Sequence, residues 1–179
     1  MRRTLCTAIV TLLVAAAPLT AQSTTPPLGV FTSLEGEWAG EAWIIRGPQG
    51  KQTLTQREWV APAAGGIVIT VRGLGTERMP DGTDAVRHDA FAIIHLDHDG
   101  KTPLMRAFTA NGNWMDMDLT ILPAGYDWKM NDPRTGEVRY EMRFDDQGRW
   151  VEKGYATRDG GTTWFQFFEM TLSRVASAP

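Results

Sequence analysis

Three polar side chains lie inside otherwise apolar segments, and their chemistry could serve a binding site. Glu58 lies in Leu54–Val60, Arg106 in Pro103–Phe108, and Tyr140 in the alternating segment 137–144. An unpaired polar group is costly to bury, so each could orient the head group of a small ligand in a cavity. The alternative is an outward side chain in an ion pair, and at Glu58 the strand parity leaves both possibilities open.

The same residues could support catalysis. A desolvated Glu58 beside Tyr140 could act as a general base on a small apolar substrate, as in an isomerase or cyclase. The sequence contains no Gly-x-Ser-x-Gly element, no Ser, His and Asp grouping and no phosphate-cradling loop. We therefore assign no catalytic residue and keep an enzyme as the alternative function.

One histidine and two carboxylates could suit a divalent transition ion. His95, Asp97 and Asp99 share one face of a strand. Asp99-Gly100 is also a strong hairpin-turn signal, and polar residues gather at such turns for solvation alone. We therefore predict a turn here and no metal site.

A second motif lies near the end of the chain. The segment 157–164 matches Ser/Thr-x-Asp-x-Gly-x-Thr-Trp and resembles the Asp-box hairpins of sialidase-like propellers. A propeller needs several copies, whereas an Asp that accepts backbone hydrogen bonds and a Gly that adopts positive φ explain one hairpin. A local turn device is the expected role.

The elements that must position these residues are antiparallel strands. Apolar residues alternate with charged ones over 137–144 and again over 114–121, a period of two. Turn clusters such as Pro80-Asp81-Gly82 and Asp99-Gly100 recur along the chain. No helical pattern of a dozen residues follows residue 28, which argues against a parallel sheet with crossover helices.

About nine or ten such strands would leave two exposed edges unless the sheet closes. We therefore predict an all-β fold, a single antiparallel up-and-down β-barrel over residues 29–175, with a two-sheet sandwich as the competing architecture. A barrel of this size can hold one small ligand. The strand parity directs further side chains inward as an adaptable ligand lining: Met115, Met117, Met142, Trp164 and Met170. The alternative is that they fill a solid core.

The two ends of the predicted barrel carry a paired signature. The first strand contains Gly36-Glu37-Trp38-Ala39-Gly40, and the last one ends at Arg174. A guanidinium stacked on an indole is worth roughly 0.5–2 kcal/mol. Small residues on the face of Trp38 leave room for its ring. We assign Trp38 and Arg174 a structural role in closing the barrel.

This pattern resembles the calycin superfamily, in which the first-strand Trp packs under a basic residue of the final strand. In its order of elements, the chain from Phe31 to Val175 resembles bacterial lipocalin-like domains of unknown function of the DUF1579 type, related in shape to nitrobindin-like barrels. Nitrobindin-like relatives hold haem through a late histidine. No histidine follows His98 here, so we expect no cofactor.

The N-terminus is typical of an export signal. Arg2 and Arg3 precede an apolar run, Leu5–Ala17, that is too short for a stable membrane span, and small residues follow at cleavage spacing. We expect a signal peptide over 1–22, a flexible lead-in over 23–28 and a short tail over 176–179. Removal of residues 1–22 would also remove the single cysteine, Cys6, which suits an oxidising compartment.

The charge balance narrows the choice of partner. The whole chain carries a net charge of −3, and loss of the two N-terminal arginines leaves 16 basic against 21 acidic residues. A mildly acidic surface without a basic run disfavours nucleic acid as a partner.

The sequence thus predicts an exported protein, periplasmic or extracellular, that binds a small hydrophobic or amphipathic molecule. A third possibility is an interaction module that uses exposed Trp43 and Trp59. The sequence does not define the oligomeric state.

Overall fold

A computed structural model describes residues 28–132 and 136–176, and these form ten strands around one interior. A one-turn helix, α1 (Gly29–Thr32), precedes them. The strands are β1 (Gly36–Ile45), β2 (Lys51–Ala63), β3 (Val68–Arg78), β4 (Asp84–Leu96), β5 (Pro103–Thr109), β6 (Trp114–Leu122), β7 (Gly125–Asp132), β8 (Gly136–Phe144), β9 (Trp150–Ala156) and β10 (Phe165–Arg174). Two 3₁₀ turns, Gly47–Gln49 and Ala64–Gly66, join the first three strands.

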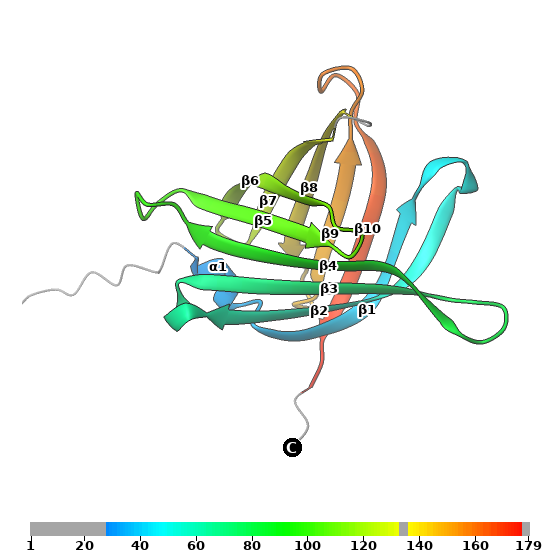
Figure 1. Cartoon of the computed structure of the whole chain (residues 1–179), viewed down its shortest axis with the longest axis horizontal. Helices are drawn as coiled ribbons and strands as arrows, with labels where there is room; N and C mark the ends of the chain where they lie inside the picture. Colours follow the sequence, from blue (N-terminus) through cyan, green and yellow to red (C-terminus); the bar gives the residue numbers. More distant parts are fainter. Residues whose placement is uncertain (1–27, 133–135, 177–179) are drawn as a thin grey trace, which may run out of the picture.

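The sheet closes on itself. Each strand pairs antiparallel with its neighbours in the chain, and β1 pairs with β10 from Trp38↔Arg174 to Ile44↔Phe168. Figure 1 shows the strands arranged around the interior, with β10 and β1 side by side. The predicted all-β up-and-down barrel is therefore confirmed, and the sandwich is excluded. Closure also removes the sheet edges that would otherwise be open to aggregation.

Alternation along the strands produces the two faces of the barrel. On β8, Val138 and Met142 are buried while Glu137 is exposed; on β6, Met117 and Leu119 are buried while Asp116 and Asp118 are exposed. Two bulges interrupt this regularity. Arg87 is the extra residue on β4, opposite Gly75 and Thr76 of β3, and Phe167 is the extra residue on β10, between Gln166 and Phe168. Each such bulge exchanges the inward and outward positions beyond it.

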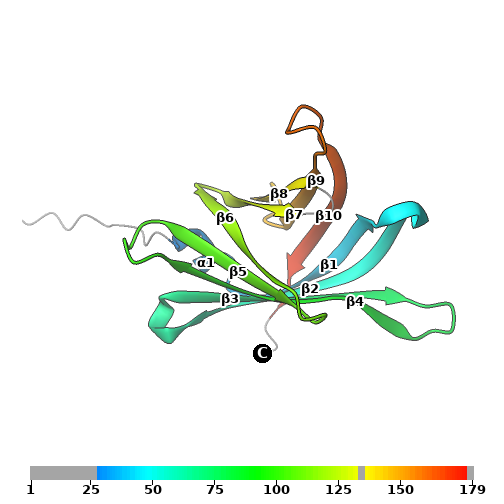
Figure 2. The same cartoon turned by 45° about the horizontal axis from the view of Figure 1, so that its top comes forward.

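One end of the barrel is closed by α1 and the segment that leads into β1. Phe31 and Leu34 have no exposed surface, and the Phe31 ring lies 5.1 Å from that of Tyr126. Figures 1 and 2 place α1 at one end of the strands, away from the β1–β2 and β3–β4 hairpins. The barrel is therefore plugged at this end by apolar side chains.

The segments flanking the barrel are described in part. Leu28, the last residue of the predicted lead-in, is 7% exposed and belongs to the core, and its carbonyl accepts a hydrogen bond from the Phe31 amide. Residues 1–27, including the predicted signal peptide, lie outside the described residues, as do residues 177–179. Within the described ranges, no helix has the length and apolar character needed to cross a bilayer.

Candidate binding cavity in the barrel

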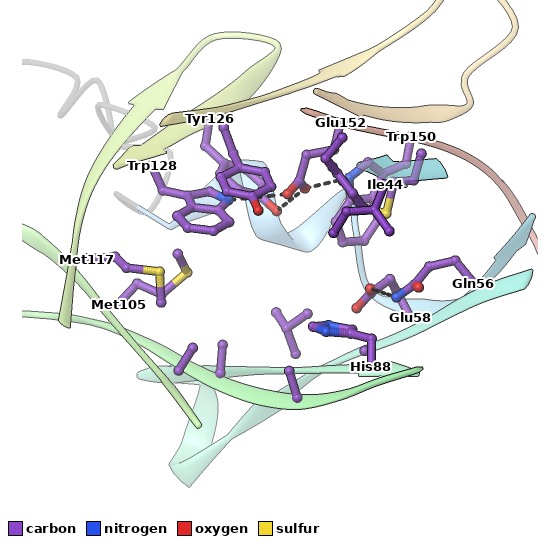
Figure 3. A pocket seen from close by; sticks show the side chains of 18 of the residues that line it. Ile44, Gln56, Glu58, His88, Met105, Met117, Tyr126, Trp128, Trp150 and Glu152 are labelled. Atoms are coloured by element: carbon purple, nitrogen blue, oxygen red, sulfur yellow. Dashed lines mark hydrogen bonds between the residues drawn. The ribbon is translucent and has the colours of Figure 1, made fainter. Parts of the chain in front are cut away.

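The barrel interior holds a cavity of about 210 Å³. Its walls come from all ten strands and are mainly apolar, with a few polar side chains directed inward, as Figure 3 shows. The apolar and aromatic part of the lining comprises Ile44, Leu54, Val71, Ala90, Ala92, Ile94, Met105, Ala107, Met117, Tyr126, Trp128, Tyr140, Trp150, Phe168 and Met170. The polar part comprises Arg46, Gln56, Glu58, His88 and Glu152. Such a lining can desolvate an apolar molecule and orient it through few polar groups.

Glu58 enters the cavity from β2 and is 7% exposed. Its Oε1 accepts a 2.7 Å hydrogen bond from Nε2 of Gln56, two residues earlier on the same face. Burial, reinforced by the charge of Glu152 and opposed by the Gln56 bond, raises the pKa of Glu58 to about 8. This carboxyl can therefore exist in both protonation states near neutral pH.

Glycines on β3 make room for these two polar side chains. Gly73 pairs with Glu58 and Gly75 pairs with Gln56. A Cβ at Gly73 would lie 2.7 Å from Oε1 of Glu58, and a Cβ at Gly75 would lie 2.6 Å from the amide oxygen of Gln56. A strand glycine often marks such a close approach, so β3 is shaped around the polar pair.

Glu152, on β9, lies on the opposite wall (Figure 3) and is also 7% exposed. Three donors converge on its carboxylate: the indole N–H groups of Trp150 at 3.2 Å and Trp128 at 3.3 Å, and the Tyr126 hydroxyl at 3.4 Å. Burial raises its pKa to about 7 against the influence of these hydrogen bonds. Glu152 is thus held in place by three aromatic side chains, and the sequence analysis missed it.

Tyr140 forms part of an aromatic wall. Its ring stacks on Trp128 with centroids 3.9 Å apart and planes 7° apart, and it contacts Phe168 at 5.6 Å. Gly154 opposes it, since a Cβ there would lie 2.8 Å from the Tyr140 ring. Burial raises the pKa of the Tyr140 hydroxyl, as it raises that of Tyr126, so both phenols stay neutral.

A wider space adjoins the cavity at the end opposite α1. It measures about 1050 Å³ and shares Ile44, Arg46 and Tyr140 with the inner cavity. Its other walls include Phe165 and Phe167. We call this space the vestibule. Because the two spaces share lining residues, the vestibule and the inner cavity are direct neighbours.

Arg46 and His88 are the basic side chains of the cavity lining, and Arg46 also borders the vestibule. Arg46 follows β1 and is exposed, and its guanidinium donates a 3.0 Å hydrogen bond to the carbonyl of Arg87. His88 lies on β4. Burial and the charge of Arg46 lower its pKa, and the charge of Asp89 opposes this effect. His88 is consequently neutral at pH 7.

Four of the residues predicted to contact or line the ligand site do line the cavity: Glu58, Met117, Tyr140 and Met170. Met115 packs against the core and Met142 is fully buried in it, but neither belongs to the cavity lining. Their inward direction was predicted correctly, and their contact with the cavity was not.

Arg106 and Trp164 do not face the interior, contrary to the inward direction expected for both. Arg106 projects from the outer face of β5. Its Nε lies 2.5 Å from Oδ1 of Asp116, and its guanidinium carbon lies 4.6 Å from the centroid of the Trp114 ring. Trp164 lies before the β10 bulge, which reverses its expected side. Its indole donates to the Gly161 carbonyl at 3.1 Å and lies 4.2 Å from the Arg139 guanidinium.

The predicted contact between Trp38 and Arg174 is present. The Arg174 guanidinium lies 4.4 Å from the indole centroid, and Trp38 is 2% exposed. Arg174 also donates hydrogen bonds to the carbonyls of Ser33 and Glu35. The pair therefore ties β1 and β10 to the segment that follows α1.

The two remaining polar motifs form hairpin turns. The Asp99 carboxylate accepts hydrogen bonds from the amides of Lys101 and Thr102 and from the Thr102 hydroxyl. Asp159 accepts from the Thr157 hydroxyl and the Thr163 amide, which helps to lower its pKa to about 2. Within residues 28–132 and 136–176, no three His, Cys, Asp or Glu side chains form a group suited to a metal ion.

The tryptophans considered for a protein interface are half-buried under basic side chains. The Lys51 ammonium lies 4.0 Å from the Trp43 ring, and the guanidinium groups of Arg72 and Arg57 lie 5.5 and 6.0 Å from the Trp59 ring. The more exposed aromatic residues are Phe165, which lines the vestibule, and Phe91, Phe108 and Trp114, which pair across β4, β5 and β6.

Comparison with known proteins gives the fold. No family model matches the chain, and no curated protein matches it. Among solved structures, the crystal structure of Rv2717c from M. tuberculosis is similar, with a TM-score of 0.59 and 11% identity over 84% of this chain and 98% of that chain. At this identity the likeness concerns the barrel fold alone.

Proposed function

We propose that this protein is an exported binding protein that holds a small hydrophobic or amphipathic molecule inside its barrel. The observation that carries the proposal is the largely apolar interior cavity of about 210 Å³ with two buried carboxyl groups directed into it. A solid core would have no reason to bury such groups without a pairing charge. Export rests on the signal-peptide pattern of residues 1–22. Membership of the calycin superfamily or of the DUF1579 type rests on the sequence resemblance.

The size of the spaces fits a ligand that bridges them. The inner cavity is smaller than the roughly 300–1,000 Å³ of a usual small-molecule pocket, but it adjoins the vestibule of about 1050 Å³. A compact ligand would lie wholly in the cavity, and a longer one would extend past Tyr140. Apolar burial would supply most of its binding free energy.

Native mass spectrometry tests this proposal directly. Protein purified from cells that express the complete chain should carry a small molecule that is released on denaturation, or should bind the neutral apolar dye Nile red with a rise in fluorescence. Ala107→Phe would fill the cavity, because Ala107 lines it next to Ala92, its partner on the adjacent strand β4. This variant should abolish both signals. Ala61→Phe, on the exposed side of β2, is the matched control. An empty wild-type protein that does not bind the dye would contradict the proposal.

A second function is favoured by one observation, the raised pKa of Glu58 in a cavity that also contains Tyr140. A carboxyl poised near neutral pH suits proton transfer to and from a bound substrate. An isomerase of this kind would exchange substrate hydrogen with solvent. Incubation of the occupied protein in D₂O should then add deuterium to a carbon of the released molecule, and Glu58→Gln should prevent it. A released molecule without carbon-bound deuterium would exclude this function for that molecule.

A further inference from the structure

The charges around the cavity are unbalanced. Glu58 and Glu152 are buried in its walls, and the basic side chains in its lining are Arg46 and His88. Arg46 is exposed and its guanidinium donates a hydrogen bond to a backbone carbonyl. Its charge acts to lower the pKa of His88 and of Tyr140. The charge that shifts the pKa of Glu58 is that of Glu152. The inner cavity therefore contains two acidic groups that repel each other when both are ionised. A positive charge between the walls would relieve both.

The two carboxyl groups differ in how far they are already satisfied. Glu152 accepts three hydrogen bonds from Tyr126, Trp128 and Trp150. Glu58 accepts one, from Gln56 through Oε1, and Figure 3 shows its second oxygen directed away from Gln56 toward the open space. Among the described residues no hydrogen bond to this second oxygen is present. Glu58 is therefore the carboxyl group with hydrogen-bonding capacity left for a donor on the ligand.

The rest of the wall suits the body of an organic cation. Trp128, Tyr140 and Trp150 line the cavity, and aromatic faces attract cations through their quadrupoles. The aliphatic surface of Ile94, Met105 and Met117 lies in the same lining and would contact apolar parts of the ligand. Both phenols remain neutral, and His88 is neutral at pH 7. Charge recognition in the interior thus depends on the two glutamates.

We propose, building on the proposed binding function, that the ligand is a protonated amine with an apolar body, and that its ammonium group donates to the free oxygen of Glu58. A neutral hydroxyl ligand would not compensate the charge of an ionised glutamate, and a carboxylate ligand would add a third acidic group to the site. The amine head group is therefore the distinguishing feature of the ligand.

Binding of such a cation releases a proton. Below pH 8 the empty cavity holds Glu58 mostly protonated, and the complex pairs the ammonium ion with the Glu58 carboxylate, so one proton passes to the buffer. Affinity should then rise with pH, by up to about tenfold per pH unit below the Glu58 pKa. A ligand that accepts a hydrogen bond from protonated Glu58 would show the opposite dependence.

The experiment uses three probes that share one body. Isothermal titration of 4-phenylbutylamine, 4-phenylbutan-1-ol and 4-phenylbutyrate into the purified protein, after removal of any co-purified molecule, compares the head groups directly. We expect the amine to bind at least about tenfold more tightly than the alcohol at pH 7.5, and the carboxylate to bind most weakly. Titrations at pH 7.5 in phosphate and in Tris, which have different ionisation enthalpies, should report about 0.8 proton released per amine bound, because Glu58 with a pKa of about 8 is mostly but not fully protonated at this pH.

Two variants locate the effect. Glu58→Gln keeps the shape of the side chain and should remove the preference for the amine and the proton release, while the alcohol binds as before. Glu41→Gln, on the exposed face of the neighbouring strand β1, should leave all three affinities unchanged. The head-group series and the proton release are measured on the wild-type protein, so they decide the proposal even if Glu58→Gln fails to fold.

The outcomes separate the two proposals. Equal affinity for amine and alcohol, tighter binding of the carboxylate, or proton uptake would overturn the amine inference and leave the binding function standing. Absence of binding by all three probes and by Nile red would overturn both.

Discussion

The carboxyl group of Glu58 occupies the space that a side chain at Gly73 would need, since a Cβ at Gly73 would lie 2.7 Å from its Oε1. Gly73→Ala should therefore displace Glu58 and break its hydrogen bond with Gln56. We expect a loss of about 1–3 kcal/mol in the free energy of unfolding and weaker binding of any ligand that contacts Glu58. Urea unfolding and ligand titration of the variant measure both effects. Unchanged binding would show that the position of Glu58 is not essential.

Gly40→Ala should be more damaging than Gly73→Ala. A Cβ at Gly40 would lie 2.1 Å from the backbone carbonyl oxygen of Thr171 on β10, and backbone cannot swing aside as a side chain can. The β1–β10 pairing that closes the barrel would have to open locally. We expect a destabilisation above about 3 kcal/mol, or no soluble protein. Comparison of the two urea midpoints gives the order, and equal midpoints would contradict this reasoning.

The two buried glutamates should make the protein less stable as the pH rises. Their pKa values in the folded state, about 8 for Glu58 and about 7 for Glu152, lie above the ordinary value of 4.5. The unfolded chain therefore loses these protons first, and unfolding becomes easier until the pH passes the folded-state pKa. His88, whose pKa is lowered, acts in the opposite sense only below about pH 6.5.

Between pH 6.5 and 8 the glutamate effect is accordingly isolated. We expect the free energy of unfolding to fall by on the order of 2 kcal/mol across this range. Glu58→Gln should flatten most of this dependence, and Glu41→Gln, whose side chain is exposed, should preserve it. Urea unfolding at several pH values measures the slope. A wild-type curve that is flat or rises over this range would contradict the assignment of buried, protonated glutamates.

The barrel was predictable because most of its strands keep a strict contrast between faces. On β8 the inward Val138 and Met142 alternate with charged residues, and no other element type has this period. Strand β9 lacks the contrast: Glu152 points inward between Trp150 and Gly154, while Val151 faces outward. The one sequence signal for the inward direction of Glu152 was its position two residues after Trp150, on the same face of the strand. A search for apolar residues alone could not find it.

The outward directions of Arg106 and Trp164 differ from the sequence expectation for separate physical reasons. Arg106 has apolar residues on both faces of its strand, because Phe108 and Leu104 are exposed on the outside. An outward Arg in such a segment looks as if it were buried. Trp164 was misplaced because the bulge between Gln166 and Phe168 reverses the side of every residue before it. A bulge of this kind leaves no mark in the alternation pattern, so sequence parity fails beyond it.

Arg174 should stabilise the closed end of the barrel more than an ordinary surface arginine does. It lies 4.4 Å from the Trp38 ring and donates to two backbone carbonyls. We expect Arg174→Met to cost about 1–3 kcal/mol in the free energy of unfolding. Arg72→Met is the control, because Arg72 is exposed, lies 5.5 Å from Trp59 and is 3.9 Å from Asp89. Thermal or urea unfolding compares them, and equal losses would contradict a special role for Arg174.

Phe167 should slow the release of a bound ligand. It is the extra residue of the β10 bulge, lines the vestibule, and contacts Tyr140 edge-on with centroids 5.6 Å apart. Tyr140 borders both the vestibule and the cavity, so removal of the Phe167 ring would free one side of this border. We expect Phe167→Ala to raise the dissociation rate of Nile red about 3- to 10-fold, with a smaller effect on the association rate. Stopped-flow fluorescence measures both rates. Phe91→Ala removes an exposed ring from the outer face of β4 and should change neither, so equal behaviour of the two variants would rule out this role for Phe167.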